Sequence, residues 1–548
     1  MNRSLIIQSD NTVMLLTSDP MFDSVKNELI KFSEIKMSPD TMYVYEITAL
    51  SIWNAIAIGI EKDYIINMLN DNSIHPVPAS VVNYISKWYN SYGVVVLEAH
   101  NDKHFFLRVS EANLRIKLKE NSVISTMLCE EVKDGFLIQP NHRGEIKSVL
   151  MKNNVSVNDK IGYSAGNELS FKIRSVHLTK NFDIEIRYYQ EESCSAVFSA
   201  GNGVVVLPCG SGKTMVGIRF AEMCQTTTLI VTNSAASVKQ WKQSLLDFTD
   251  LTEDQISCYD ANNKTFAPVT ICTYHMLAYK SKGEFIHFNR FIQQSWGALI
   301  LDEVHLMPAN MFRIVASFQA TKRLALTATF VREDGREKDI FTLIGPKRYD
   351  KPWKDLEAQG YIASVNLKEL RVPLTKKDKK SYLEAKNYQD KLDIAVMSEN
   401  KVEAIRFLLA KHKGEKILII GQFVDQLEVI SGMLNIPVVH GQNSDKEREF
   451  YYDKMRSDNI NELIASSIAN AALDIPGISV VIQISFLGGS RNEEAQRVGR
   501  ATRPKDCPAY FYTLVSKDTM EEAQNFNRQQ FLTGEGYKYE IQEMAMVA

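Results

Sequence analysis

The segment that most constrains this chain is Leu207-Pro208-Cys209-Gly210-Ser211-Gly212-Lys213-Thr214. An apolar, β-branched stretch precedes it, and a helical pattern follows it. A glycine loop between a strand and a helix offers backbone N–H groups to nucleotide phosphates, with a lysine for the β- and γ-oxygens and a hydroxyl for magnesium. Leu207 stands where the common GxxxxGK[ST] pattern has glycine. The order of strand, loop, lysine, hydroxyl and helix nevertheless predicts an NTP site in which Lys213 binds phosphate and Thr214 binds the metal.

A pair of acids closes another apolar strand, at 298–301, in the sequence Asp302-Glu303-Val304-His305. The carboxyl ends of strands are where an open α/β sheet binds its ligands. Hydrolysis of an NTP needs one carboxylate for magnesium and one that orients or deprotonates water. We therefore assign Asp302 to the metal and Glu303 to the water. His305 either couples the ATP state to other motifs or is a structural histidine.

Three arginines follow at a spacing of three, at Arg497, Arg500 and Arg503. At the start of a helix this spacing would place them on one side. Arginine stabilises charge on a transferring phosphoryl group, an effect of about 10³–10⁵ in rate for some NTPases. The alternative is an ordinary basic helix face. Because the arginines lie far along the chain from the phosphate loop, we expect the nucleotide cleft to be formed by two domains.

From residue 203 onward the sequence alternates short apolar strands with amphipathic helices, which is typical of a parallel sheet covered on both faces. The predicted strands lie at 204–207, 229–231, 298–301 and 324–326, and again at 416–420, 437–439, 463–465 and 480–484. Two doubly wound α/β domains are expected, joined after Gly345-Pro346. The first 165 residues differ: a hairpin at 5–16, helices within 45–100, and short strands and turns at 100–165.

Composition excludes several classes of protein. The 548 residues are 45% apolar and 24% charged, which is typical of a globular chain of three or four domains. The longest apolar run, at 49–60, is too short to span a bilayer, and the N-terminus has no signal-peptide core. Seven scattered cysteines without a CxxC pair argue against a zinc ribbon, an iron–sulfur cluster or a disulfide framework. We therefore expect a location inside the cell, and a net charge of −3 neither supports nor excludes DNA binding.

Taken together, these motifs resemble superfamily 2 helicases, and most closely the XPB (Ssl2, Rad25-like) DNA helicases, especially their bacterial and archaeal members. The most discriminating piece is Arg332-Glu333-Asp334, which resembles the family's RED motif, implicated in unwinding. Other matching segments are the adenine-reading segment with Arg187 and Gln190, motif Ia at 233–235 with Gln240-Trp241, the DNA-facing Thr273-Tyr274, motif III at 326–329, the segments at 344–347, 360–363 and 488–497, and the two chain ends.

The resemblance implies two RecA-like motor domains preceded by a smaller α+β region. The expected domains are an XPB-type N-terminal domain at 1–100, a small α+β, damage-recognition-like domain at 101–165, an ATP-binding domain at 166–348 and a C-terminal helicase domain at 349–548. A short thumb-like insertion is expected near 375–400, where Lys376, Lys377, Lys379 and Lys380 with interleaved tyrosines suit single-stranded DNA or form a solvated helix face. Motif V departs from the family's Gly-Asp pair, although Asp474 remains.

The resemblance also implies ATP and Mg²⁺ as cofactors, and 3′→5′ movement on single-stranded and forked DNA. Nucleotide contacts are expected from Arg187, Gln190, Pro208–Thr214, Asp474 and Arg497, and γ-phosphate contacts from Arg500 and Arg503. Further expectations are a role in DNA repair, a partner nuclease or repair factor, a monomer or weak oligomer, and a cytoplasmic, nucleoid-associated location if the protein is bacterial. The alternatives are an RNA-directed ATPase, a duplex translocase or motor subunit of a nuclease or defence complex, and a scaffold without activity.

Overall fold

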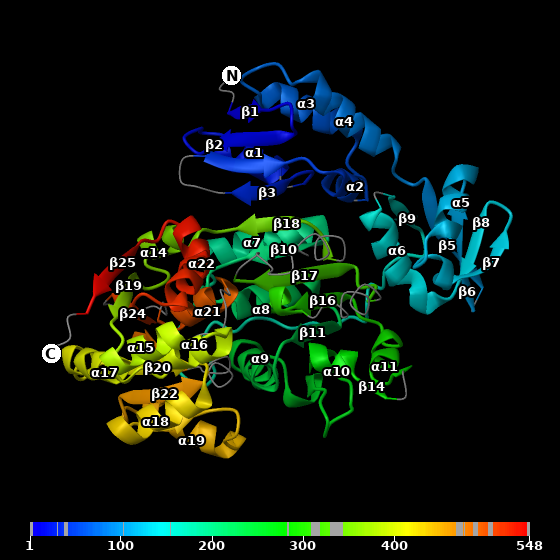
Figure 1. The fold of residues 1–548 in the computed structure, drawn as a ribbon. Helices are drawn as coiled ribbons and strands as arrows, with labels where there is room; N and C mark the ends of the chain where they lie inside the picture. Colours follow the sequence, from blue (N-terminus) through cyan, green and yellow to red (C-terminus); the bar gives the residue numbers. More distant parts are fainter. Residues whose placement is uncertain are drawn as a thin grey trace. The chain divides into compact units, whose positions relative to one another are not determined.

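The computed structural model describes residues 4–29, 31–37, 42–57, 59–101, 103–153, 155–281, 284–307, 318–328, 344–466, 475, 477–485, 491–501 and 508–544. They form two compact units, one comprising 1–207 and 212–351 and the other 208–211 and 352–548. Each unit contains one parallel sheet of seven strands (Figure 1). Among these described residues, no helix is long and apolar enough to cross a membrane.

The nucleotide-binding part of the first unit is a parallel sheet in the order β12-β13-β11-β16-β17-β10-β18. Its strands are rich in Val, Ile and Leu because side chains on both faces are buried. The four strands expected in this half are confirmed, whereas β12, β13 and β18 were not predicted. The strands are β10 (Asn202–Val206), β11 (Thr228–Thr232), β12 (Ile256–Cys258), β13 (Val269–Thr273), β16 (Ala298–Leu301), β17 (Lys322–Thr327) and β18 (Lys347–Asp350).

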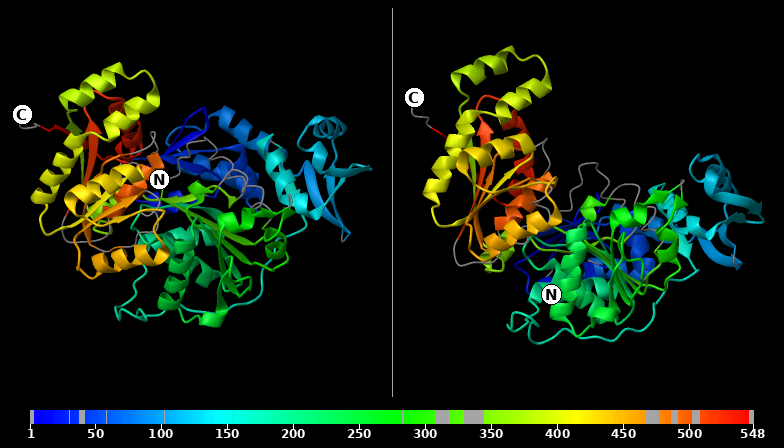
Figure 2. Two further views of the ribbon diagram at one scale, coloured as in Figure 1. Left: turned by 60° about the horizontal axis from the view of Figure 1, so that its bottom comes forward. Right: turned by 90° about the horizontal axis from the view of Figure 1, so that it is seen from below.

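Helices accompany this sheet, and Figure 2 shows them beside its strands in two further views. Three of them build the candidate site: α7 (Tyr188–Ala200), α8 (Lys213–Cys224) and α9 (Ala235–Phe248). Two others are short, α10 (Tyr274–Ala278) and α11 (Phe288–Ile292). A 3₁₀ turn, η4 (Val304–Leu306), follows the acidic pair. Thus the loop and the acids lie at the carboxyl ends of β10 and β16, as the sequence predicts.

The first 165 residues contain two smaller sheets. The expected hairpin is confirmed as β1 (Leu5–Ile7) and β2 (Thr12–Leu16), paired antiparallel with Leu5 opposite Leu15. Strands β3 (Glu34–Met37) and β4 (Met42–Glu46) complete this sheet, and α1 (Phe22–Leu29), α2 (Ala49–Ala57), α3 (Lys62–Asn72) and α4 (Ala79–Asn90) accompany it. Its own hydrophobic core joins sheet and helices.

A second small sheet has the order β7-β8-β6-β5-β9. It comprises β5 (Val95–Asn101), β6 (His104–Val109), β7 (Leu128–Val132), β8 (Gly135–Ile138) and β9 (Val157–Asp159). Helices α5 (Ala112–Glu120) and α6 (Arg143–Lys152) also belong here, and the sequence reading as strands and turns alone missed them. Because β5 begins at Val95, this core starts before residue 100. The four domain boundaries stay predictions.

The second unit has a parallel sheet in the order β21-β22-β20-β23-β24-β19-β25. The four predicted strands are confirmed as β20 (Lys416–Gly421), β21 (Val438–Val439), β22 (Glu462–Ser466) and β23 (Ile478–Gln483). The others are β19 (Val365–Val372), β24 (Ala509–Ser516) and β25 (Tyr539–Glu543). Its helices are α14 (Trp353–Ala358), α15 (Lys376–Glu384), α16 (Tyr388–Val396), α17 (Glu399–Lys411), α18 (Val424–Leu434), α19 (Asp445–Arg456), α21 (Arg491–Ala501) and α22 (Met520–Gly534).

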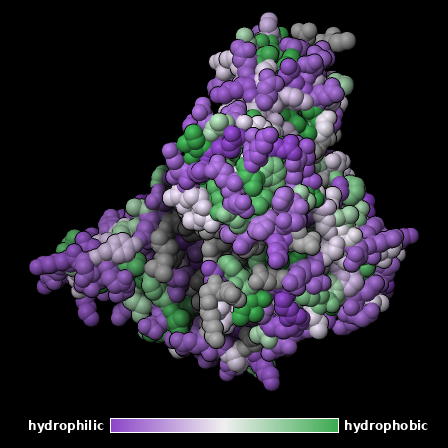
Figure 3. Space-filling model, turned by 90° about the vertical axis from the view of Figure 1, so that its right-hand side faces the viewer, coloured by the Kyte–Doolittle hydropathy of each residue, from purple (hydrophilic) through white to green (hydrophobic). Residues whose placement is uncertain are grey.

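The predicted fold class is therefore confirmed: two parallel α/β sheets preceded by a smaller α+β region. Hydrophilic side chains dominate the face shown in Figure 3, with apolar side chains in separate groups between them. Large exposed apolar residues occur on several elements, for example Ile116 on α5 and Leu383 on α15. Isolated groups of this kind are normal on a globular surface.

Candidate active site

The phosphate loop is held by its neighbours at both ends. The N–H of Leu207 donates to the carbonyl of Thr327 at 3.0 Å, which ties the start of the loop to the end of β17. At the other end Gly212 has φ +84° and directly precedes α8. The positive φ of Gly212 disfavours any other residue, and a Cβ there would lie 2.6 Å from Nε2 of Gln190 and displace that amide. A glycine loop that leads into the start of a helix is the kind of site that binds phosphate.

Lys213 and the acidic pair share one site, as the sequence predicts. The Nζ of Lys213 lies 3.8 Å from Oε1 of Glu303 and 3.4 Å from the carbonyl oxygen of Leu207. The lysine side chain is only 11% exposed, so its charge acts in a partly desolvated site where electrostatic attraction is stronger than in water. A cation and two carboxylates therefore meet beside the start of α8.

Asp302 has a donor on each carboxylate oxygen. The indole N–H of Trp241 donates to Oδ2 at 2.8 Å, and the N–H of Glu303 donates to Oδ1 at 3.0 Å. Removal of the Asp302 carboxyl from water, together with the nearby charge of Glu303, raises its pKa to about 6. Two acids held this close disfavour each other's ionisation, and a divalent cation would relieve the repulsion. Asp302 therefore fits a magnesium site, with Thr214 at the start of α8 as the second residue for it.

The raised pKa predicts a pH-dependent stability. Below the unfolded-state pKa near 4, Asp302 is neutral in both states. Its unfavourable contribution grows as pH rises from about 4 to about 6 and is complete above pH 6, because the native state holds its proton more tightly than the unfolded state. We expect Asp302→Asn, without nucleotide and with EDTA, to raise the Tm of its domain at pH 8 by a few degrees, corresponding to about 1–3 kcal/mol. Calorimetry at pH 8 and pH 4 checks this, and an equal gain at both pH values would contradict it.

His305 connects the acids to the neighbouring strand. Its side chain is 1% exposed, and Nδ1 lies 2.8 Å from Oγ1 of Thr327 and 3.4 Å from Oε2 of Glu303. Thr327 lies at the end of β17, within the segment that resembles motif III. These contacts fit the role expected from the sequence, in which His305 couples the ATP state to other motifs. A structural histidine, the alternative, would have the same burial and contacts.

The expected adenine-reading residues stand at the start of α7. Arg187 is the N-cap residue; its backbone N–H donates to Oε1 of Gln190 at 3.0 Å, and its guanidinium donates to the hydroxyl of Tyr189 at 2.9 Å. Gln190 is 4% exposed and its Nε2 donates to the carbonyl of Gly212 at 3.4 Å. The two residues are therefore joined to each other and to the last glycine of the phosphate loop.

In the second unit, Arg497 and Arg500 do not occupy a helix start. Helix α21 begins at Arg491, so Arg497 and Arg500 lie in its second half, which corrects the sequence reading. Arg497 is 2% exposed and donates to Oε1 of Gln483 at 2.7 Å and to Oε2 of Glu493 at 3.0 Å. Burial, and then the charge of Arg528, lower its pKa to about 10. Arg497 therefore anchors α21 within its own domain. The Arg500 side chain, Arg503 and Asp474 lie outside the described residues.

A buried ion pair also holds α21. Arg528 on α22 donates to Oε2 of Glu494 at 3.0 and 3.1 Å, and both side chains are fully buried. The Nε2 of Gln483 donates to the same oxygen at 3.2 Å, and the hydroxyl of Tyr539 donates to Oε1 at 3.3 Å. Strand β23, helix α22 and strand β25 are thereby joined to α21 through Glu494.

We expect Arg528→Met to destabilise the second unit by about 3–5 kcal/mol, because Glu494 then keeps a buried charge without its cation. Adding Glu494→Gln should recover part of the loss, since the charge is removed as well. Thermal unfolding of the single and double variants measures both effects. A double variant that is no more stable than Arg528→Met would show that the charge of Glu494 does not matter.

Comparison with known proteins identifies the family. The ERCC3/RAD25/XPB C-terminal helicase model matches residues 356–547, the type III restriction enzyme res subunit matches 183–332, and the helicase conserved C-terminal domain matches 5–133. A "DNA 3′-5′ helicase XPB" from Kineococcus radiotolerans is 39% identical over 540 residues, which cover 98% of this chain and 96% of the relative. The chain belongs to the XPB family. It is therefore an enzyme, an ATP-dependent DNA helicase, as the motifs predict.

Two further relatives extend the likeness. A protein of the same name from Mycobacterium tuberculosis is 37% identical, with coverage of 98% of this chain and 97% of that protein. The "general transcription and DNA repair factor IIH helicase/translocase subunit XPB" of Enterocytozoon bieneusi is 33% identical, with coverage of 98% and 92%. The XPB likeness therefore includes the first 165 residues as well as both parallel sheets.

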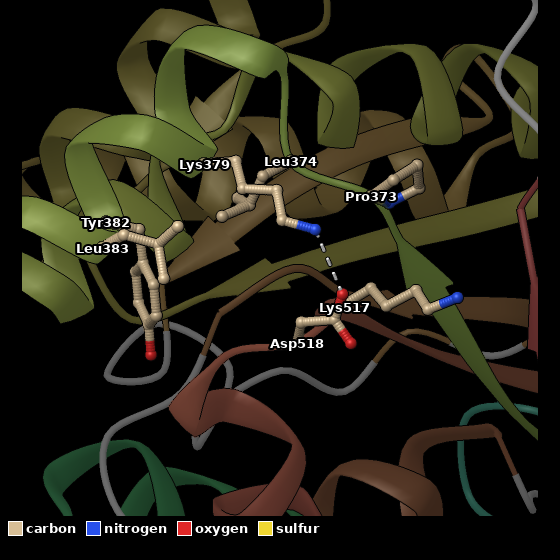
Figure 4. Close-up of a pocket in the computed structure, with 7 residues that line it drawn as sticks. All are labelled: Pro373, Leu374, Lys379, Tyr382, Leu383, Lys517 and Asp518. Atoms are coloured by element: carbon tan, nitrogen blue, oxygen red, sulfur yellow. Dashed lines mark ion pairs between the residues drawn. The ribbon is translucent and has the colours of Figure 1, made fainter.

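In this XPB family member, the segment near 375–400 that is expected to be thumb-like contains two helices, α15 and α16. Lys376, Lys377, Lys379 and Lys380 are exposed on α15. Lys379 forms an ion pair with Asp518 at 3.6 Å, across a pocket that Tyr382, Leu383, Pro373, Leu374 and Lys517 also line (Figure 4). The hydroxyl of Tyr382 accepts from the N–H of Met520 at 2.8 Å. This tyrosine therefore fastens α15 to the start of α22, while the four lysines provide a basic exposed surface.

The other residues expected to face DNA divide into three cases. Thr273 is half-buried and is the N-cap of α10, where its Oγ1 accepts from the N–H of Met276. Tyr274 is 1% exposed and its hydroxyl donates to the carbonyl of Asp302 at 3.0 Å, so its ring lies inside the domain. Arg332, Glu333 and Asp334 lie outside the described residues.

Sequence reasoning missed the roles of two residues. Trp241 was assigned only as part of motif Ia, whereas its indole contacts the metal-binding candidate Asp302. Gln483, at the end of β23, carries no motif signal but joins Arg497 to Glu494. An apolar strand that ends in a lone amide was the one available signal for Gln483.

Proposed function

We propose that this XPB family member uses ATP hydrolysis to move 3′→5′ along one DNA strand and to separate the strands of a duplex. One observation carries the catalytic part of the proposal. Lys213 of the phosphate loop lies 3.8 Å from Glu303, which adjoins Asp302 at the carboxyl end of a buried strand. This proximity supports phosphate binding, metal binding and water activation at one edge of the first parallel sheet.

In this proposal, backbone N–H groups of 210–214 and the ammonium group of Lys213 bind the β- and γ-phosphates of ATP. Thr214 and Asp302 would hold Mg²⁺, which when bound neutralises charge on the phosphate oxygens. Glu303 orients the attacking water and accepts its proton. His305, which contacts both Glu303 and Thr327, transmits the state of the site to the end of β17.

The second parallel-sheet domain supplies Arg500 and Arg503 for the γ-phosphate during the cycle, while Arg497 holds α21, the helix that carries Arg500, in its domain. Asp474 contributes to nucleotide contacts, as do Arg187 and Gln190. The arginines stabilise the charge that develops on the transferring group. Because Arg497 is fixed to Gln483, α21 moves with its sheet as one body.

For the nucleic acid, we propose single-stranded and forked DNA as the substrate. The lysines of α15 would bind backbone phosphates, with Thr273 at the first domain, and Arg332-Glu333-Asp334 would act at the fork. We also propose a role in DNA repair with a partner nuclease or repair factors, and a cytoplasmic, nucleoid-associated location; likeness to the family supports both.

The test compares ATP hydrolysis with matched DNA and RNA oligonucleotides, single-stranded and duplex. Stimulation by single-stranded and forked DNA, accompanied by strand separation, is expected. Equal or greater stimulation by RNA would favour an RNA-directed ATPase. ATP-dependent displacement of a bound protein from duplex DNA without strand separation would favour a duplex translocase, and no hydrolysis under any condition would favour a scaffold.

A further inference from the structure

We propose that Trp241 is a positioning residue for the metal-binding carboxylate: its indole N–H fixes the orientation of Asp302. The inference rests on the proposed function in one respect, namely that Asp302 holds magnesium. It goes further by giving a catalytic-site role to a residue of α9, a helix whose start resembles a DNA-facing motif.

The hydrogen bonds leave Asp302 little freedom. Trp241 Nε1 lies 2.8 Å from Oδ2, and the backbone nitrogen of Glu303 lies 3.0 Å from Oδ1. The terminal torsion of an aspartate is soft by itself, so two donors from separate elements are needed to hold the plane of the carboxylate. One donor comes from α9 and the other from the turn after β16. Loss of the indole donor would leave Oδ2 free to rotate away from a cation.

The indole ring is itself held in place by the phosphate-loop helix. Trp241 is 2% exposed. A Cβ added to Gly217 of α8 would lie 2.4 Å from Cη2 of the indole, so the backbone of α8 touches the ring. Lys213 begins the same helix. One side chain therefore contacts both the helix that carries the phosphate-binding lysine and the carboxylate assigned to the metal.

The competing explanation is an ordinary core tryptophan whose N–H happens to find an acceptor. The same domain provides a matched control for it. Trp296 is 5% exposed, and its Nε1 donates to the backbone carbonyl of Phe291 at 2.9 Å. Trp→Phe at either position removes one indole N–H and a similar volume from the core, but only Trp241 contacts Asp302.

The experiment titrates Mg²⁺ against the full chain and a fluorescent ADP analogue, read by anisotropy, with an EDTA reference. For Trp241→Phe we expect the half-saturating Mg²⁺ concentration to rise by about 10-fold or more, as for other residues that orient metal ligands. Affinity for the analogue in EDTA should stay at the parental value. Trp296→Phe should leave both quantities unchanged. An equal Mg²⁺ requirement in the two variants would overturn the proposal.

Two further variants separate the possible failures. Asp302→Asn should raise the Mg²⁺ requirement at least as much as Trp241→Phe; if it has no effect, the metal assignment in the proposed function is wrong. Gly217→Ala keeps the indole N–H but pushes the ring, and should raise the Mg²⁺ requirement while circular dichroism shows an intact fold. A folded Gly217→Ala protein with the parental requirement would contradict the role of the ring position.

Discussion

Replacing Lys213 with alanine is expected to lower the kcat of DNA-stimulated ATP hydrolysis at least about 100-fold, the usual cost of losing one preorganised group that stabilises transition-state charge. The side chain of Lys213 is only 11% exposed, and its Nζ lies 3.8 Å from Oε1 of Glu303, so the charge that is removed belongs to the centre of the candidate site. Loss of so central a cation should weaken both ATP binding and turnover. A phosphate-release assay with single-stranded DNA measures the effect.

The control for this variant is Lys242→Ala. Lys242 lies on α9 in the same domain, but it pairs with Glu253 at 2.8 Å near the surface. The Lys242→Ala protein should hydrolyse ATP at the parental rate. It loses only a surface ion pair, which contributes at most about 1 kcal/mol to stability, so the fold is retained. Both variants should have parental circular dichroism spectra. Hydrolysis by Lys213→Ala at the parental rate would refute the assignment of the phosphate loop.

Replacing Glu303 with glutamine is expected to separate ATP binding from hydrolysis. The amide keeps the shape of the side chain but can neither accept a proton from water nor carry its charge. General base catalysis contributes about 10²–10⁴ in rate, so kcat should fall by that factor. Affinity for ATP should be retained, because Lys213 then faces a neutral neighbour and stays available for phosphate. Pre-steady-state hydrolysis and equilibrium binding measure the two quantities.

Glu253→Gln provides the matched control, since that acid is 75% exposed and pairs with Lys242. It should change neither quantity. A Glu303→Gln protein that loses affinity for ATP in proportion to its loss of kcat would contradict the role in water activation. It would instead indicate that Glu303 organises the binding site.

The sequence predicts the parallel strands best where both faces are buried. Strands such as β16 and β20 are continuous runs of apolar residues, a pattern that few other structures produce. Strand β19 was missed because it carries Lys368, Glu369 and Arg371. Two of these charged side chains have partners far along the chain: Lys368 pairs with Glu540 at 2.9 Å, and Glu369 accepts from the amides of Asn525 and Gln529 at 2.9 Å. Local patterning does not contain that information.

Helix α5 was not predicted, and the start of helix α21 was predicted at the wrong residue, because the local sequence pattern is misleading in both places. Helix α5 alternates apolar and basic residues in Leu114-Arg115-Ile116-Lys117-Leu118, which resembles a half-buried strand. Helix α21 was placed too late, although Glu493 and Glu494 supply the acidic first turn that is typical of a helix start. The spacing of the arginines by three residues does not itself indicate where the helix begins.

The catalytic site was predictable where chemistry lies within a short motif. The residues of the loop at 207–214, like those of the pair Asp302-Glu303, are adjacent in the sequence, so each motif can be recognised locally. The order of the two motifs along the chain then predicts that they form one site. The contacts that orient them were not predictable. Trp241 lies 61 residues from Asp302, and their hydrogen bond depends on how α9 packs beside α8. Such contacts become visible only in the folded chain.

The central claim is that ATP hydrolysis at Lys213, Asp302 and Glu303 drives 3′→5′ strand separation of DNA. The most direct measurement is unwinding of a fluorescently labelled duplex with a 3′ or a 5′ single-stranded tail, with ATP and Mg²⁺, by the parental protein and Glu303→Gln. We predict ATP-dependent unwinding of the 3′-tailed duplex by the parental protein, little with the 5′ tail, and none with Glu303→Gln. Unwinding that favours the 5′ tail, or that persists in Glu303→Gln, would contradict the account.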